Sequence, residues 1–190
     1  MFLAVFAALS LITVPLAGGR IERLARLRLR WKPVIFAALA IQIVIVTLRP
    51  GGDPGLHRVL HLVSYAFAAG FLIVNRRTPG MLLIAIGAVC NVTAIVANNG
   101  TMPASAGALR AAGQLPTTGG FLNSGPLAHP HLLLLGDVFA IPKWVPLNNV
   151  FSVGDVCIAV GAAIMIHAVS GSKLLAWRTR AAVAAPVPTH

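Results

Sequence analysis

Apolar residues occur along this chain in five runs, separated by short connections and by one long segment. Each run holds about 16 to 19 residues, near the roughly 17–25 residues with which a helix crosses a bilayer core. An open strand would leave backbone groups unpaired in lipid, so helix is the expected state. The predicted spans are Phe2–Gly18, Pro33–Leu48, Leu56–Val74, Gly80–Ala97 and Val153–Ser170.

The composition favours a membrane protein over a soluble domain. Of the 190 residues, 57% are hydrophobic and 10% are charged, and the mean hydropathy is +0.85. Soluble domains carry about one quarter charged residues, so these few charges cannot cover a water-facing surface. We therefore predict an all-α fold, a single integral membrane domain over residues 1–190 with five transmembrane helices. A disordered chain and a disulfide scaffold are excluded.

The net charge of +11 predicts the orientation of the bundle. In a soluble protein it would indicate nucleic acid, but here the basic residues lie between apolar runs, so no nucleic-acid partner is expected. Eleven of the fifteen Lys and Arg residues follow the first, third and fifth runs. The positive-inside rule then puts the N-terminus outside and the C-terminus in the cytoplasm.

The first basic connection is predicted to lie along the cytoplasmic face of the membrane. Anionic lipid attracts each such Arg by about 1 kcal/mol, and Trp suits the interface. Membrane lipids with anionic headgroups are therefore the expected partners of this segment. The residues expected to contact headgroups are Arg20, Arg23, Arg26, Arg28, Arg30, Trp31 and Lys32.

The long segment between the fourth and fifth runs, residues 98–151, is expected outside as a partly ordered loop. Its first half is rich in glycine and is predicted to be flexible. Its second half carries four consecutive leucines, Leu132–Leu135, which are unfavourable in water. We expect this half to fold back onto the outer membrane face or to re-enter the bilayer as a lid.

Polar side chains within the runs gather towards the outer side. In the third run, three of them share one helical face at i, i+4 and i+8. Intramembrane polar groups are costly and are functional candidates. The sequence therefore predicts an outer-leaflet pocket for a small polar ligand, an ion or a lipid headgroup. Its residues are His57, His61, Tyr65, Asn91, Asn98, Asp137, Ser152 and Asp155.

Structural explanations compete at each of these positions. Ser152 and Asp155 have the spacing of a capping box that opens the fifth helix, and Asn91 suits a contact between helices. The tripeptide Gly-Asp-Val occurs twice, around Asp137 and Asp155. Turn and cap chemistry explains it, and a shared water or cation is the alternative.

Two further functional hypotheses stay open. The chain could be an accessory subunit of a larger membrane complex, or form a homo-oligomer, through faces of small residues. It could also be a membrane enzyme with a metal on His57 and His61, although zinc needs about three or four ligands. No phosphate loop, dinucleotide fingerprint or nucleophile elbow occurs. Hence no catalytic residue, metal or cofactor is predicted, and an enzyme is disfavoured.

Six short stretches, in order along the chain, resemble the family classed as domain of unknown function 5317. They are Arg23–Trp31, His61–Tyr65, Asn75–Gly80, Asn98–Pro103, Leu135–Asp137 and Asn149–Val156. The resemblance implies a small polytopic protein of the bacterial inner membrane, folded as one unit. It implies no activity.

Overall fold

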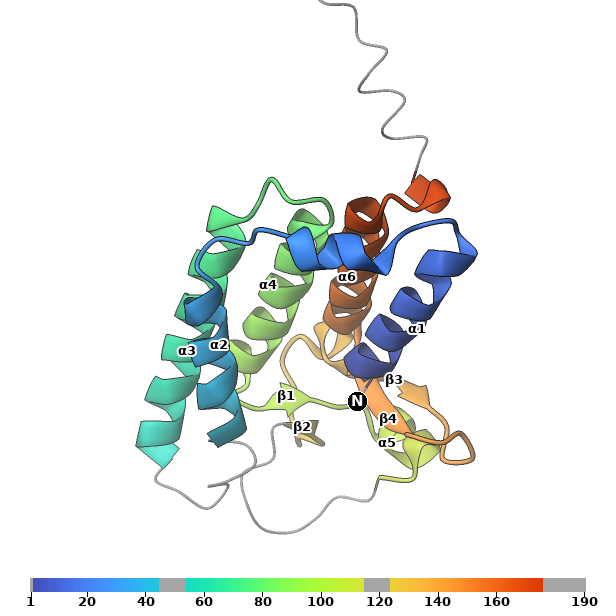
Figure 1. The fold of residues 1–190 in the computed structure, drawn as a ribbon. Helices are drawn as coiled ribbons and strands as arrows, with labels where there is room; N and C mark the ends of the chain where they lie inside the picture. Colours follow the sequence, from blue (N-terminus) through green and yellow to red (C-terminus); the bar gives the residue numbers. More distant parts are fainter. Residues whose placement is uncertain (1, 45–53, 115–123, 176–190) are drawn as a thin grey trace, which may run out of the picture.

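The fold is mostly helical, as expected. The structure, a computed structural model, describes residues 2–44, 54–114 and 124–175. Five long helices within these ranges run alternately up and down (Figure 1). They are α1 (Phe2–Leu16), α2 (Lys32–Ile43), α3 (Pro54–Val74), α4 (Met81–Ala97) and α6 (Val153–Ser170). The predicted end of the second run, residues 45–48, lies outside the described residues.

The helices differ in how well they fit a membrane. Among the described residues, α6 is the one helix both long and apolar enough to cross a bilayer, and the other four apolar helices are shorter. The helical bundle is therefore confirmed, whereas five membrane crossings stay a prediction.

Local sequence signals set several helix ends. Pro33 lies in the first turn of α2, where its missing N–H costs nothing. Gly80 precedes α4 with φ of 81° and Gly171 follows α6 with φ of 69°, both in the left-handed region that glycine adopts readily. Ser152 and Asp155 form the predicted capping box of α6.

The described parts of the predicted outer loop, residues 98–114 and 124–151, form a folded cap at one end of the helices (Figure 1). A parallel pair and an antiparallel pair of strands organise it, with a bulge between Asp137 and Phe139 in the second pair. The cap contains β1 (Met102–Pro103), α5 (Ala106–Ala112), β2 (Ser124–Gly125), η3 (Leu133–Leu135), β3 (Asp137–Ile141) and β4 (Asn149–Ser152).

The cap corrects two expectations. The all-α class is right for the helical majority but omits these strands. A flexible first half is wrong over Met102–Ala112, because Ser105 caps α5 and Ala108, Leu109 and Val150 form a small apolar core. Phe2 stacks on Phe151 at 4.2 Å between ring centroids, which ties the start of α1 to the cap. Contact of the cap with a bilayer stays a prediction.

The bundle exposes many large apolar side chains and buries several polar ones beside apolar residues such as Phe71 and Met81. Its buried side chains include Ser10, Ser64 and His167, whereas Leu16 is 81% and Leu82 68% exposed. Soluble proteins rarely expose contiguous apolar patches, so this exposure is informative about the surroundings. Further large apolar side chains exposed on the helices are Leu9, Ile12, Phe36, Leu39, Leu62, Ile73, Val89 and Val96.

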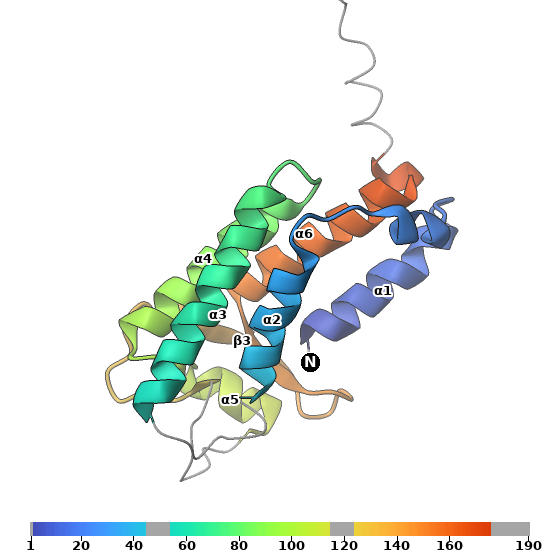
Figure 2. The same cartoon turned by 60° about the vertical axis from the view of Figure 1, so that its left-hand side comes forward.

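The basic connections lie together at the end opposite the cap (Figures 1 and 2). The backbone N–H of Arg20 donates to the Ser170 carbonyl, and that of Lys173 donates to the Ala17 carbonyl, each over 2.9 Å. These bonds hold η1 (Ile21–Arg26) and η4 (Lys173–Leu175) against the ends of α1 and α6. Arg178 and Arg180 lie outside the described residues.

Four glycines bring the antiparallel helices α4 and α6 into close contact. A side chain on Gly87 would meet the Gly154 carbonyl, and one on Gly161 would lie 2.7 Å from the Gly80 carbonyl. Small residues at such crossings let helix backbones approach. The pairs Gly80–Gly161 and Gly87–Gly154 are seven residues apart on both helices, so one face of each helix carries the crossing.

Gly87→Ala is expected to destabilise the protein by about 2 kcal/mol, since overpacking a tight contact costs roughly 1–3 kcal/mol. The measurement is the thermal midpoint in detergent. Gly107→Ala is the matched control, because nothing lies within 4 Å of an added side chain in α5, and it should leave the midpoint unchanged or slightly higher. Equal effects of the two variants would contradict a tight crossing.

Candidate functional site

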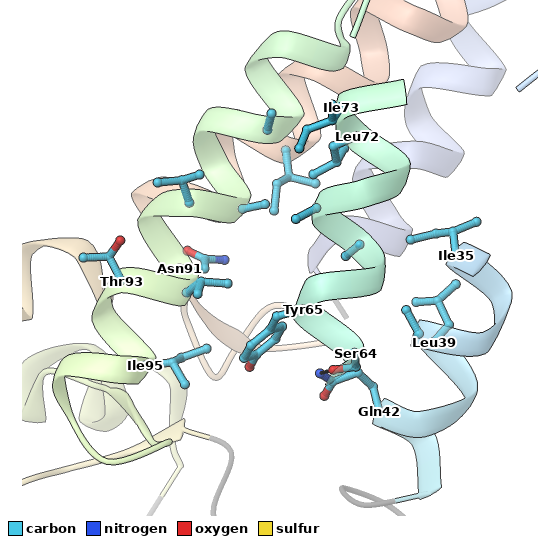
Figure 3. A pocket seen from close by; sticks show the side chains of 18 residues that line it. Ile35, Leu39, Gln42, Ser64, Tyr65, Leu72, Ile73, Asn91, Thr93 and Ile95 are labelled. Atoms are coloured by element: carbon cyan, nitrogen blue, oxygen red, sulfur yellow. Dashed lines mark hydrogen bonds between the residues drawn. The ribbon is translucent and has the colours of Figure 1, made fainter. Parts of the chain in front are cut away.

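A cavity of about 540 Å³ lies between α2, α3 and α4, with one contribution from α6 (Figure 3). It occupies the gap between two parts of the bundle, because α2 packs on α3 and α4 packs on α6, while α3 and α4 contact each other far less. We call it the inter-helix cavity. Its lining is Ile35, Ala38, Leu39, Gln42, Ser64, Tyr65, Ala68, Ala69, Leu72, Ile73, Ala85, Ala88, Val89, Asn91, Val92, Thr93, Ile95 and Ile158.

The inter-helix cavity has a polar end and an apolar end. Figure 3 shows Gln42, Ser64 and Tyr65 together at its cap side, while Leu72 and Ile73 lie towards the basic end. The Gln42 amide donates to the Ser64 hydroxyl over 2.6 Å. Within the described ranges of the chain, no Asp, Glu, Lys, Arg or His belongs to the lining. The cavity thus suits a molecule with a long apolar part and a short polar part.

The rim of the inter-helix cavity is apolar. Three lining residues from three helices are also exposed at the bundle surface: Leu39 at 52%, Ile73 at 62% and Val89 at 64%. An occupant would therefore pass hydrocarbon side chains on its way in.

A second group of polar residues lies beside the inter-helix cavity, where the cap meets α4 and α6. Asn91, which lines the cavity, donates its amide N–H to Asp155 over 2.9 Å and accepts from the Ser152 hydroxyl over 2.8 Å. Asp155 also accepts from the Ser152 backbone N–H over 3.0 Å. These bonds confirm that Asn91 joins two helices. We call Asn91, Ser152, Asp155, Asp137 and Ser124 the polar junction.

Asp137 brings the cap into the polar junction. It is 6% exposed, pairs with Ser152 in the β3–β4 register, and accepts a hydrogen bond from the Ser124 hydroxyl. Burial raises the pKa of this carboxyl above its ordinary 3.8; the Ser124 bond opposes the shift and the charge of Asp155 adds to it. Asp137 and Asp155, the aspartates of the two Gly-Asp-Val tripeptides, are therefore neighbours. A water or cation shared between them stays a prediction.

The remaining predicted site residues do not join a single pocket. Asn98 binds the cap backbone, since its amide accepts from the His131 N–H over 2.8 Å and donates to the His131 carbonyl over 2.7 Å. His61 is buried and its ring lies 5.6 Å from the Tyr65 ring. The side chain of His57 lies outside the described residues.

No metal site emerges from the part of the chain that the structure describes, where no three His, Cys, Asp or Glu residues group closely enough. The hypothesis of a metal on His57 and His61 stays a prediction, because the structure does not describe the His57 side chain.

The predicted headgroup segment is attached to the bundle. The Arg23 side chain lies over Gly171 at the C-terminus of α6, where a cation is favoured by the helix dipole. Trp31 is 53% exposed, and its ring lies 3.5 Å from the position of a side chain on Gly70.

Two polar residues of structural weight were not predicted. Gln42 lines the cavity, and Asn75 binds the backbone of Arg30, accepting from its N–H over 2.8 Å and donating to its carbonyl over 2.9 Å. Gln42 lies inside an apolar run and Asn75 just after one. Because burying an amide is costly unless it is hydrogen-bonded, these two positions were the signal in the sequence that could have pointed to them.

Asp137→Asn is expected to flatten the dependence of stability on pH. Because the folded pKa is raised, the unfolded carboxyl releases its proton first. The group's contribution is full below pH 3.8 and is lost as pH rises towards the folded pKa. Thermal midpoints in detergent across mildly acidic to neutral pH would measure this. The variant should be at least as stable as the parent at neutral pH, and a destabilisation equal at every pH would contradict a buried, proton-retaining carboxyl.

Comparison with known proteins gives one match. A family model described as Family of unknown function (DUF5317) matches residues 26–167, about three quarters of the chain. The matched segment contains the whole lining of the inter-helix cavity and the whole polar junction. No curated protein and no solved structure matches the chain.

Proposed function

The chain belongs to the family of unknown function DUF5317, and we propose that it is a five-span membrane protein that binds a lipid-like molecule in the inter-helix cavity. The observation that carries this proposal is the cavity itself, which is apolar, polar at one end, and open through an apolar rim.

The exposed surface of the helices supports the membrane setting. Leu and Val side chains on α1, α3 and α4 face outward, while serines and histidines are buried. Burial of apolar surface contributes about 25 cal/mol per Å², so this arrangement favours hydrocarbon around the bundle. Helices shorter than 18 residues fit by thinning the bilayer locally or by little tilt.

The arrangement of basic residues supports the orientation. The connections before α2 and before α4, together with Lys173, lie at the end of the bundle opposite the cap. We propose that this end faces the cytoplasm of a bacterial cell and contacts anionic lipid, with the cap outside.

Thiol labelling tests this orientation. In a background with Cys90→Ala and Cys157→Ala, a membrane-impermeant maleimide added to intact cells should label Ala111→Cys in the cap and leave Arg77→Cys unlabelled. Both positions are exposed. Permeabilised cells give the control, in which both label. Labelling of position 77 in intact cells would show that the orientation is the opposite of the one proposed.

The cavity's size and lining support a lipid-like occupant. Its volume of about 540 Å³ lies within the roughly 300–1,000 Å³ typical of ligand pockets. Its rim of Leu39, Ile73 and Val89 would face hydrocarbon, so the occupant is a molecule that partitions into the bilayer. Gln42, Ser64, Tyr65 and Asn91 would receive its polar group.

Filling the cavity tests the proposed binding. Ala68→Phe places a ring in the lining, and steric exclusion of about 1.4 kcal/mol or more should lower the lipid retained after purification in mild detergent by roughly tenfold. Mass spectrometry of the extracted lipid measures this.

Ala66→Phe is the control for this experiment. It lies on the same helix, is exposed, and does not line the cavity, so its retained lipid should match that of the parent. Equal retention by all three proteins would refute the proposed site.

A further inference from the structure

Resting on the proposed function, we infer that the occupant of the inter-helix cavity has an uncharged head, a carbonyl or hydroxyl group on a long hydrocarbon tail. Ordinary membrane phospholipids are then not its ligand. The inference follows from the charges, the hydrogen-bonding groups and the shape of the cavity.

The charges described around the cavity favour an uncharged head over an anionic one. Among the lining residues that the structure describes, none is basic and so none could neutralise a phosphate, and an unpaired buried charge is costly. The nearest ionisable groups behind Asn91 are carboxyls, because its amide binds Asp155 and the charge of Asp155 acts on Asp137. A phosphate at the polar end would therefore meet like charge.

A cationic head is not favoured either. Asp155 does not line the cavity, and both of its carboxylate oxygens already accept hydrogen bonds, from the Asn91 amide and the Ser152 N–H. An ammonium group in the cavity would thus meet amides and hydroxyls in place of a free carboxylate.

The polar end does offer hydrogen bonds. An amide nitrogen carries two hydrogens, and that of Asn91 donates one of them to Asp155; among the residues that the structure describes, the other meets no acceptor. Figure 3 shows the Asn91 amide and the Tyr65 hydroxyl on facing sides of the cavity. A carbonyl or hydroxyl oxygen between them could accept from both.

The apolar end of the cavity suits a hydrocarbon tail on the occupant. Beyond Tyr65 the lining consists of Ala, Val, Leu and Ile side chains, as far as Leu72 and Ile73. Long-chain acylglycerols and isoprenoid quinones share this chemistry of an uncharged oxygen head on a hydrocarbon tail.

Matched probes test the inference. Delipidated protein in detergent would be titrated with 1-oleoylglycerol and with 1-oleoylglycerol 3-phosphate, which differ by one phosphate, and with a decyl-substituted benzoquinone. Native mass spectrometry reports bound probe. We expect the phosphate to bind at least about tenfold more weakly than 1-oleoylglycerol, since an unpaired buried charge is costly. The tighter of the two uncharged probes indicates which source of head the cavity takes.

Tyr65→Phe is the diagnostic variant. Loss of one hydrogen bond should weaken binding of the preferred uncharged probe about fivefold and leave binding of the phosphate probe unchanged. The thermal midpoint of the variant shows whether its fold is intact. Phosphate binding as tight as 1-oleoylglycerol overturns the uncharged head and leaves the cavity's lipid function standing. The proposed function itself fails if no probe binds the parent. It also fails if every probe binds the parent and Ala68→Phe equally well.

Discussion

The close crossing of α4 and α6 is the contact on which the rest of the structure depends. In the proposed membrane setting, hydrophobic attraction between helices is weak, so packing and hydrogen bonds would hold them together. Here four glycines bring two backbones together over two turns, and Asn91 then reaches Asp155 and Ser152. Because Asn91 is also a wall of the inter-helix cavity, the crossing positions the site as well as the bundle.

The sequence predicted those features that depend on local or periodic signals. Hydrophobic runs gave the five long helices, and the i, i+3 spacing of Ser152 and Asp155 gave the capping box. Asn91 as a link between helices followed from the cost of an amide in an apolar run. The strands of the cap were missed because each is only two to five residues long and lies among Gly and Pro.

The candidate site was predicted only in part. The sequence grouped eight polar residues into one pocket, whereas the structure divides six of them among a cavity, a junction and a loop clamp, and places His61 beside Tyr65 but outside the cavity lining. Tyr65 and Asn91 line the cavity, Asp137, Ser152 and Asp155 form the junction, and Asn98 holds His131. The division depends on contacts between residues up to 64 apart in sequence, which spacing within one helix cannot give.

The direct join between β4 and α6 has a mechanical consequence. β4 ends at Ser152 and α6 begins at Val153, so no linker absorbs movement between hairpin and helix, and any displacement of the hairpin turns the first helical turn with it. Phe2 couples α1 to the same strand through Phe151. The hairpin is therefore fixed to α1 and α6 at once, and the Ser152 hydroxyl, which donates to Asn91, extends this connection to α4.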